Sequence, residues 1–463
     1  MRRSYRTIAI VLLALALGTW LRLWFLWHFP QVNGDGLTYG DIAKNWLTHG
    51  IYGRTEFTAA GATVQPTLIR LPGYPLFLAA CFRVFGVDHY GAVLYLQVAI
   101  DLISALIVAW TAQTIAGRRA GMWALYLAAL CPFTANYVAA PLTETLSIFC
   151  VALACAGIAW LQMRPGWLPC LLLATSLSYA TLLRPDGALL AVASFLAIVL
   201  FANRSFVGRT PLGRARAWRY VVTAGLLSVV PFAFWTARNL RTFHLFEPLA
   251  PRYATDPGEF TAPGFQRWMK TWIVDFTSTS DIYWNVDNAQ LEVNLLPTRA
   301  FDSAAEHEET ADVVAAYNGN TTLTPAIDGR FGALAAEREH RHPLRSYVAL
   351  PLLRVLDMWL RPRTEMLNIE LRWWQYDRHH AETEFAAAYA LLNFAYIAMA
   401  ALGAWRLRHK ATTVIAAIVI YCMLRSLLLA TIEAPEARYT IEAFPMLCIL
   451  AGAAFASRMA TRE

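Results

Sequence analysis

Long apolar runs divide the sequence and limit the folds that are open to it. The first extends from Ile8 to His28, and an α-helix needs about 20 such residues to cross a bilayer. Of the 463 residues, 57% are hydrophobic and 15% are charged, whereas a soluble chain has roughly 25% charged residues. The sequence therefore predicts an all-α membrane protein with several spans.

Basic residues lie in six short clusters between the apolar runs. Because they do not follow one face of a soluble domain, the net charge of +7 does not favour nucleic acid as a partner. Cytoplasmic loops are rich in Lys and Arg, so the clusters predict a cytoplasmic N-terminus and about ten crossings, with all six clusters inside. The clusters are Arg2/Arg3/Arg6, Arg118/Arg119, Arg164, Arg204/Arg209/Arg214/Arg216/Arg219, Arg406/Arg408/Lys410 and Arg458/Arg462. The crossings centre near Leu17, Ala99, Leu127, Val151, Ser176, Phe195, Ser228, Ala395, Ile418 and Leu450.

Two outer segments are too long to be mere connections, and they are where chemistry is expected. They define an N-terminal transmembrane module with the first outer loop, an outer-face cap, and C-terminal transmembrane helices. The bounds are 1–238 for the module with its loop at 30–88, 239–382 for the cap and 383–463 for the last helices. In the cap, the pattern predicts helices over 300–314 and 346–360.

The first outer loop contains two apolar patterns that are too short to span a bilayer. Leu37 to Leu47 and Pro75 to Phe85 each predict a short helix. Trp46 and Tyr74 supply amphipathic rings that favour the depth of the lipid headgroups. We expect both helices to lie at the membrane interface.

Asp35, in Gly34-Asp35-Gly36, lies just after the first span on the predicted outer side. It could be the N-cap of the helix that starts near Leu37, with its oxygens accepting free backbone N–H groups. It could instead be a general base that takes a proton from an acceptor hydroxyl. The local pattern leaves both interpretations open.

Arginines recur at the outer ends of the predicted spans, where the positive-inside rule does not expect them. They are Arg70, Arg184, Arg238 and Arg438. An anionic ligand on that face, best a phosphate, would explain them. Glu144 lies at the same predicted level as Arg184. The alternatives are local: Arg70 in a rigid turn, Glu144 at a helix N-terminus and Arg184 at helix C-terminal carbonyls.

The ordered set of these motifs resembles the GT-C glycosyltransferases, and specifically polyprenyl-phosphate-sugar-dependent members related to protein O-mannosyltransferases and aminoarabinose transferases, of the family 39/83 type. The resemblance covers nearly the whole chain. Its pieces are Gly34-Asp35 with Tyr39 and Ala43, Arg70-x-Pro72-Gly73-Tyr74-Pro75, Gln97, Thr143-Glu144, Arg184-Pro185, Trp235-x-x-Arg238-Asn239 and Arg438-Tyr439.

This resemblance implies a GT-C bundle with a lipid-phosphate sugar donor and an active site on the outer face. It implies that Asp35 is the catalytic residue. Arginines near the leaving phosphate would stabilise its growing charge; we assign that role first to Arg70, then to Arg438 and Arg238. The supporting residues are Tyr39, Tyr74, Glu144, Arg184, Asn239 and Tyr439.

One position departs from the family pattern, because relatives often carry a second acid where this chain has Gly36. Asp41 points to a different helix face and does not replace that acid. A single base is sufficient, since a polyprenyl phosphate leaves as an anion and needs no acid. Direct displacement would invert the anomeric centre.

The sequence thus predicts sugar transfer from a polyprenyl-phosphate donor to a glycan, lipid or protein acceptor, at the outer or periplasmic face of the cytoplasmic membrane. The seven cysteines lie in apolar runs without metal-ligand spacing. No cofactor is expected; a divalent metal is left open without a ligand set to support it. Membrane lipid is the remaining partner.

A transporter or flippase is the main alternative. Gln97 and Asp101 lie four residues apart in the second span, and Arg425 lies within the ninth. Buried charges of this kind can line a translocation path. A structural ion pair between Asp101 and Arg425 would account for them equally well.

Overall fold

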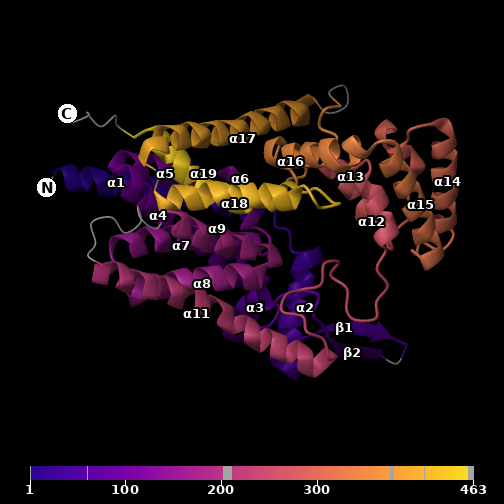
Figure 1. The fold of residues 1–463 in the computed structure, drawn as a ribbon, viewed down its shortest axis with the longest axis horizontal. Helices are drawn as coiled ribbons and strands as arrows, with labels where there is room; N and C mark the ends of the chain where they lie inside the picture. The colour runs from indigo at the N-terminus through magenta and orange to yellow at the C-terminus, as the bar shows by residue number, and fades with distance from the viewer. Residues whose placement is uncertain (1, 60, 202–210, 376–379, 411, 457–463) are drawn as a thin grey trace. The chain divides into compact units, whose positions relative to one another are not determined.

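The computed structural model describes residues 2–59, 61–201, 211–375, 380–410 and 412–456 (Figure 1). The predicted cytoplasmic residues Arg204, Arg209, Arg458 and Arg462 lie outside these ranges. The described chain forms two compact units. The first comprises Met1–Gly258, Ala395–Leu424 and Ile441–Glu463, and the second Glu259–Phe394 and Arg425–Thr440. The predicted cap, 239–382, overlaps the second unit, which also includes residues just before the last helix.

Helices dominate both units. In chain order the elements begin with α1 (Arg2–His28), α2 (Gly34–His49), β1 (Gly53–Thr58), β2 (Gly61–Pro66), α3 (Gly73–Phe85), α4 (Tyr90–Ala116), α5 (Arg118–Ala129), α6 (Pro132–Tyr137), α7 (Glu144–Met163), α8 (Trp167–Leu183), η1 (Pro185–Gly187), α9 (Ala188–Leu200) and α11 (Pro211–Phe243). They continue with α12 (Pro263–Lys270), α13 (Phe276–Ser278), η2 (Thr279–Tyr283), η3 (Val293–Leu295), η4 (Thr298–Ala300), α14 (Ala304–Asn318), α15 (Pro325–Arg341), η5 (Arg345–Ala349), α16 (Leu350–Leu360), α17 (His380–Leu407), η6 (Arg408–Lys410), α18 (Thr413–Leu429), η7 (Ala437–Ala443) and α19 (Phe444–Ala454).

Five helices of the described chain are long and apolar enough to cross a membrane, so the protein is a multi-pass membrane protein. They are Ile8–His28, Tyr90–Ala116, Glu144–Met163, Gly213–Phe243 and His380–Leu407. The other five predicted crossings fall on α5, α8, α9, α18 and α19, which have 11 to 17 residues. At about 1.5 Å per residue these are shorter than the roughly 30 Å of hydrocarbon. Crossing by these helices stays a prediction.

The first outer loop contains the two predicted short helices, α2 and α3, and a β-hairpin that the sequence analysis missed. β1 and β2 pair antiparallel, with Gly53 opposite Pro66. Asp41 in α2 anchors the hairpin, since its carboxylate accepts from the backbone N and the hydroxyl of Thr55, both at 2.7 Å. Asp256 anchors the open end, just after β2, by accepting from the Thr67 hydroxyl at 2.7 Å.

A buried ion pair joins the helices of the first unit. Arg22 in α1 is fully buried, and its Nε donates to Oδ2 of Asp101 in α4 at 2.7 Å. Its Nη1 donates to the carbonyls of Gly18 at 2.9 Å and Ala129 at 2.6 Å. The guanidinium therefore connects α1, α4 and the end of α5. The proposed pairing of Asp101 with Arg425 is wrong, because Arg22 holds this carboxylate.

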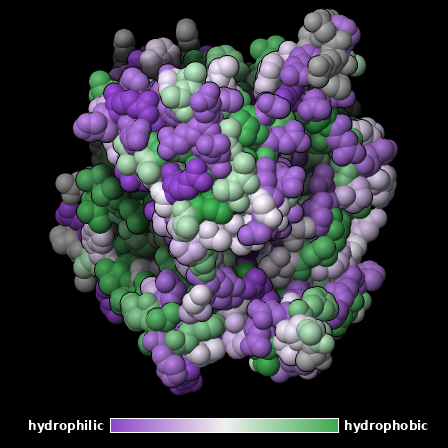
Figure 2. Space-filling model, turned by 90° about the vertical axis from the view of Figure 1, so that its right-hand side faces the viewer, coloured by the Kyte–Doolittle hydropathy of each residue, from purple (hydrophilic) through white to green (hydrophobic). Residues whose placement is uncertain are grey.

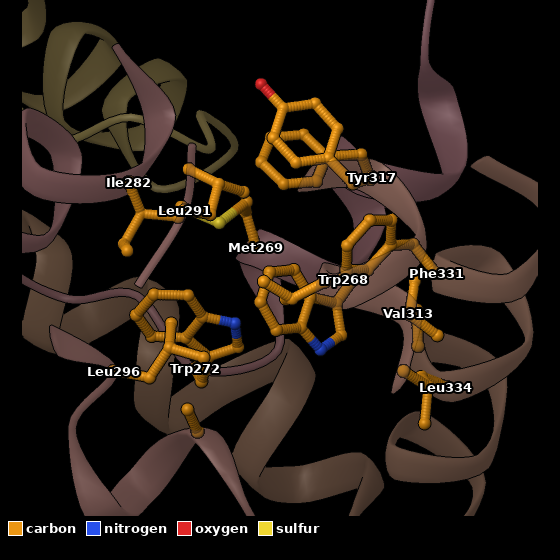
Figure 3. Packing of buried hydrophobic residues seen from close by; sticks show 14 of the residues in the cluster. Trp268, Met269, Trp272, Ile282, Leu291, Leu296, Val313, Tyr317, Phe331 and Leu334 are labelled. Carbon is orange, nitrogen blue, oxygen red and sulfur yellow. The ribbon is translucent and has the colours of Figure 1, made fainter. Parts of the chain in front are cut away.

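The second unit has its own aromatic core, in which Trp268 and Trp272 of the α12 region pack with Phe331 of α15 and Tyr317 of α14 (Figure 3). Trp268 and Phe331 have ring centroids 4.8 Å apart. The helices predicted over 300–314 and 346–360 are present as α14 and as η5 with α16. This core shows that the long outer segment is a folded body rather than a loop.

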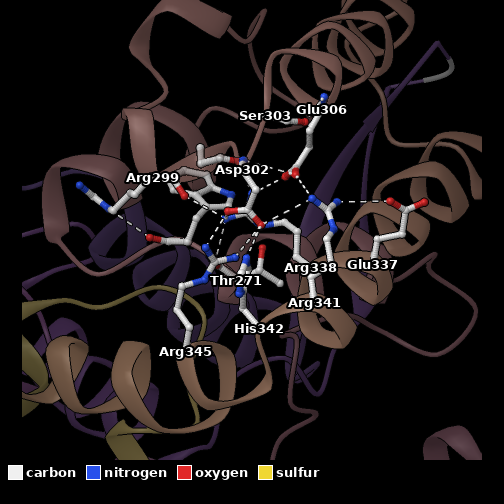
Figure 4. Close-up of polar contacts among 12 residues, drawn as sticks. Thr271, Arg299, Asp302, Ser303, Glu306, Glu337, Arg338, Arg341, His342 and Arg345 are labelled. Atoms are coloured by element: carbon white, nitrogen blue, oxygen red, sulfur yellow. Dashed lines mark hydrogen bonds and ion pairs between the residues drawn. The ribbon is translucent and has the colours of Figure 1, made fainter.

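Ion pairs close one edge of this core (Figure 4). Arg338 in α15 is fully buried; it pairs with Glu306 and donates to the Ala300 carbonyl at 2.8 Å. Asp302 accepts from Arg345 at 2.6 Å, and this hydrogen bond holds the pKa of Asp302 below its usual value. In Figure 2, hydrophilic residues dominate the upper part of the face that is drawn. These contacts suit a module that faces water.

We expect substitution of Asp101 by alanine to destabilise the protein by about 3–5 kcal/mol, because it leaves the Arg22 charge buried without its partner. A double variant, Arg22→Met with Asp101→Leu, should recover most of that loss. Lys44→Ala serves as the control, since Lys44 pairs with Asp88 at the surface, where both side chains are nearly half exposed, and should cost at most about 1 kcal/mol. Equilibrium unfolding in mixed micelles measures all three. Equal losses for Asp101→Ala and Lys44→Ala would contradict the assignment.

Candidate active site

Asp35 and Arg70 form an ion pair in the first outer loop. Asp35 lies in the first turn of α2, and its Oδ1 accepts from Nη2 of Arg70 at 2.7 Å. The side chains are 34% and 23% exposed respectively, so the pair can be reached from solvent. The N-cap position belongs to Asn33, without a side-chain cap. The N-cap interpretation of Asp35 is therefore wrong.

Gly36 lies at a close approach between α2 and the segment before α7. A Cβ at this position would lie 2.6 Å from Cγ of Pro141 and 3.2 Å from its carbonyl oxygen. A side chain of any size would push α2 away from the segment that enters α7. The close approach fixes the first turn of α2, and with it the position of Asp35.

Aromatic and amide contacts support the ion pair of Asp35 and Arg70. The Arg70 guanidinium lies 5.7 Å from the Tyr39 ring centroid, and Tyr39 packs edge-on against Tyr74 at 5.1 Å. The Tyr74 hydroxyl donates to Oε1 of Gln97 at 2.8 Å, and Nε2 of Gln97 donates to the Ala140 carbonyl at 2.8 Å. The predicted Tyr39 and Tyr74 are thus brought together with Asp35 and Arg70.

Burial raises the pKa of Tyr39 to about 12, with the positive charge of Arg70 opposing the shift. Tyr39 is therefore neutral at physiological pH. It can offer a ring face and a hydroxyl, but it cannot act as the base. Within this group of contacts, Asp35 supplies the carboxylate.

α3 starts against the end of α8. A Cβ on Gly73 would meet the Leu182 backbone at 2.6 Å, and the Tyr179 hydroxyl donates to the Gly73 carbonyl at 2.9 Å. Only glycine allows this approach. It brings the Arg70 turn beside the segment that carries Arg184.

Arg184 is at the centre of a carboxylate cluster. Its guanidinium pairs with Glu144 at 3.3 Å, with Asp186 at 3.2 Å and with Glu442 at 3.2 Å. The predicted Glu144 and Arg184 are thus brought together. Asp186 and Glu442 were not among the predicted site residues. An acid beside an apolar run, such as Glu442, could have indicated a functional position.

Arg238 ties the end of α11 to the first outer loop, and Asn239 beside it binds the segment that follows α11. Arg238 donates to the carbonyls of Thr67 at 2.8 Å and Tyr52 at 2.7 Å, and its guanidinium lies 5.2 Å from the Tyr52 ring centroid. Asn239 is fully buried and donates to the Glu247 carbonyl at 2.7 Å. These contacts position the loop that carries Arg70.

Arg438 and Tyr439 belong to the second unit, where both contact Glu436. Nε of Arg438 lies 2.6 Å from Oε2 of Glu436, and the Tyr439 hydroxyl donates to Oε1 at 2.6 Å. The guanidinium also faces the Tyr439 ring at 5.5 Å. The two predicted residues thus form one local group.

No protein-family model and no curated protein matches the chain. Solved structures do. The apo oligosaccharyltransferase of the archaeon Archaeoglobus fulgidus aligns with a TM-score of 0.52 at 13% identity, over 96% of this chain and 50% of that one. The same organism's oligosaccharyltransferase AglB, in complex with an inhibitory peptide and a dolichol-phosphate, aligns with a TM-score of 0.51 at 11% identity, over 98% and 50%.

The chain has the GT-C fold. It spans about half the length of the archaeal oligosaccharyltransferase. ArnT from Cupriavidus metallidurans bound to undecaprenyl phosphate also aligns, with a TM-score of 0.40 at 13% identity, over 96% of this chain and 77% of that one. The predicted GT-C bundle is confirmed.

We expect Gly36→Ala to destabilise the GT-C bundle by about 1–3 kcal/mol, because the new methyl group overlaps the rigid ring of Pro141. Gly91→Ala is the matched control: it also lies in a helix, but nothing is within 4 Å of the added Cβ. Alanine there should be neutral or stabilise by up to about 1 kcal/mol. Thermal unfolding in detergent compares the two. Equal stability of both variants would show that the close approach at Gly36 does not matter.

Proposed function

We propose that the chain is a glycosyltransferase that moves a sugar from a polyprenyl-phosphate carrier to a glycan, lipid or protein acceptor on the outer face of the cytoplasmic membrane. The observation that carries this proposal is the half-buried pair of Asp35 and Arg70, a base beside a cation, on the first outer loop of a GT-C membrane protein.

The reaction needs one proton acceptor. A hydroxyl or amine of the acceptor attacks the anomeric carbon of the sugar, and its proton passes to the Asp35 carboxylate. The bond between the anomeric carbon and the phosphate oxygen breaks, and polyprenyl phosphate leaves as an anion. Because attack and departure occur on opposite sides of the sugar, the anomeric configuration inverts. The leaving group takes no proton, so a second carboxyl acid is unnecessary.

Arg70 is the first candidate for the leaving phosphate. Its guanidinium combines a positive charge with planar N–H donors that suit phosphate oxygens. Held beside Asp35 and over the Tyr39 ring, it is already oriented when the donor arrives. Such preorganised charge is usually the largest contribution to catalysis.

Arg438, beside Tyr439 and Glu436, is the second candidate for the phosphate. Arg238 is bound by carbonyls of the first outer loop, so we assign it chiefly to holding that loop, with phosphate contact as a secondary role. Glu144 and Arg184 would support the site through their own ion pair.

The archaeal oligosaccharyltransferase with the same fold was solved with a dolichol-phosphate and a peptide, which supports a lipid phosphate and a separate acceptor as the substrate classes here. The contacts also weaken the transporter alternative. Asp101 is neutralised by Arg22, and Gln97 is held by Tyr74 and the Ala140 carbonyl. Arg425, the third residue that suggested a translocation path, donates to the Tyr439 carbonyl at 2.8 Å.

The purified protein in detergent should transfer sugar from polyprenyl-phosphate sugars to envelope acceptors, because the reaction needs no membrane gradient. Radiolabelled donors with different sugars, followed by chromatography of the products, measure the transfer. Mass spectrometry of the envelope glycans of a deletion strain identifies the sugar and acceptor to use. Movement of the lipid-linked sugar only in sealed vesicles under a gradient, without transfer in detergent, would favour the transporter instead.

Arg70→Ala should weaken binding of the donor by at least about tenfold, the effect of losing a hydrogen bond to a charged group. Arg70→Lys should recover only part of the affinity, because an ammonium lacks the planar fork. Arg54→Ala is the matched control, since Arg54 lies in the same loop but pairs with Asp256 at 3.1 Å. Titration with a fluorescent polyprenyl phosphate measures all three. If Arg70→Ala and Arg54→Ala bind alike, Arg70 has no part in donor binding.

A further inference from the structure

One helix of the second unit exposes a continuous apolar face. From the end of α15 into η5 and α16, apolar residues recur every four positions, one above the other on the helix surface. They are Leu344, Val348, Leu352, Leu356 and Leu360, which are 78%, 50%, 57%, 51% and 42% exposed. Tyr347 and Leu353 extend this face. Contiguous exposed apolar residues on this scale mark a contact surface.

The opposite side of the same helix is fixed to the second unit. Leu350, Arg354 and Met358 are buried, and Arg354 donates to the carbonyls of Lys270 at 2.9 Å and Ile273 at 3.2 Å. The helix therefore cannot turn its apolar side inward.

The end of this helix is joined to a membrane span within the same unit. Asn393 in α17 donates to the Trp359 carbonyl at 2.8 Å and accepts from Nε of Arg363 at 3.2 Å. Trp359 donates through its indole nitrogen to Ser426 of α18 at 3.1 Å. Because α17 is apolar enough to cross the membrane, these bonds hold the end of α16 close to the bilayer.

Charges flank the apolar face as they do in helices that lie on membranes. Arg341 and His342 are exposed just before it, Arg345 lies in its first turn, and all three also lie within ion-pair distance of Asp302. Asp357, the acid within α16, pairs with Arg361 at 3.3 Å. Basic residues beside an apolar face favour anionic headgroups.

We propose that the apolar face of Leu344 to Leu360 lies in the outer leaflet of the bilayer, at the boundary between headgroups and acyl chains, and docks the second unit on the membrane. The 17-residue stretch is about 25 Å long, too short to cross roughly 30 Å of hydrocarbon. The proposal goes beyond sugar transfer and does not depend on it. It makes the predicted cap a membrane-attached module rather than one surrounded by water.

Nitroxide labels on the full chain in vesicles with anionic lipid test this. Single cysteines at Leu352 and Leu356 carry the labels, with the seven native cysteines replaced by alanine. Glu308→Cys, at an exposed position of α14, is the control for a label in water. Leu391→Cys in α17, where Leu391 is 69% exposed, is the control for a label in lipid. Power saturation measures collisions with oxygen, which concentrates in lipid, and with a nickel chelate, which stays in water.

We expect the labels at Leu352 and Leu356 to follow the lipid control, with nickel collisions several-fold lower than at Glu308 and high collisions with oxygen. Nickel collisions as frequent as at Glu308 would place the face in water and overturn the proposal. A different result would be few collisions with both reagents, together with spectral line broadening that decreases when unlabelled protein is added. It would show that the apolar face contacts a second copy of the chain, and it would also overturn the proposal.

Discussion

The ion pair between Arg22 and Asp101 fixes the helices on which the first outer loop rests. Inside an apolar bundle a charge without a partner is costly, so this pair confines α1, α4 and α5 to one arrangement. Gln97 lies one turn before Asp101 on α4 and binds Tyr74. The helices that satisfy a buried charge are therefore the same ones that present the candidate site.

A series of side-chain contacts connects α4 to Asp35. Gln97 holds Tyr74, Tyr74 packs on Tyr39, Tyr39 lies under Arg70, and Arg70 pairs with Asp35. Each step is a hydrogen bond, a ring contact or an ion pair that fixes how two side chains are oriented. Together these contacts hold Asp35 in place on a loop. A reacting group needs such support, because small displacements lower the rate steeply.

The acids in and beside the first outer loop differ in their partners. Asp41 receives the amide and hydroxyl of Thr55, and Asp256 receives the hydroxyl of Thr67, so both fasten the hairpin. Asp35 faces an arginine and keeps a third of its side chain exposed. This difference is why we propose Asp35, and not Asp41 or Asp256, as the acid that takes part in the chemistry.

Much of the fold was predictable, because span length and the positions of basic residues reflect the bilayer directly. The two short helices of the first outer loop also followed from the sequence, which put Glu144 and Arg184 at one level but did not predict that they pair. The hairpin was missed because its strands are short and depend on Asp41 and Asp256 to hold them. Asp101 was paired with the wrong arginine, since periodicity does not show which spans are neighbours. Likewise, Glu442 reaches Arg184 only through the fold.

The turnover of Asp35→Asn tests the central claim most directly. Asparagine keeps the size of the side chain and a carbonyl acceptor for Arg70, but it cannot take a proton. Asp88→Asn is the control, because Asp88 is the last residue of the same loop and pairs with Lys44 at the surface. We expect Asp35→Asn to fold and bind donor normally while losing about two to four orders of magnitude in turnover, and Asp88→Asn to retain its rate. Near-parental turnover by Asp35→Asn would contradict its role as the base.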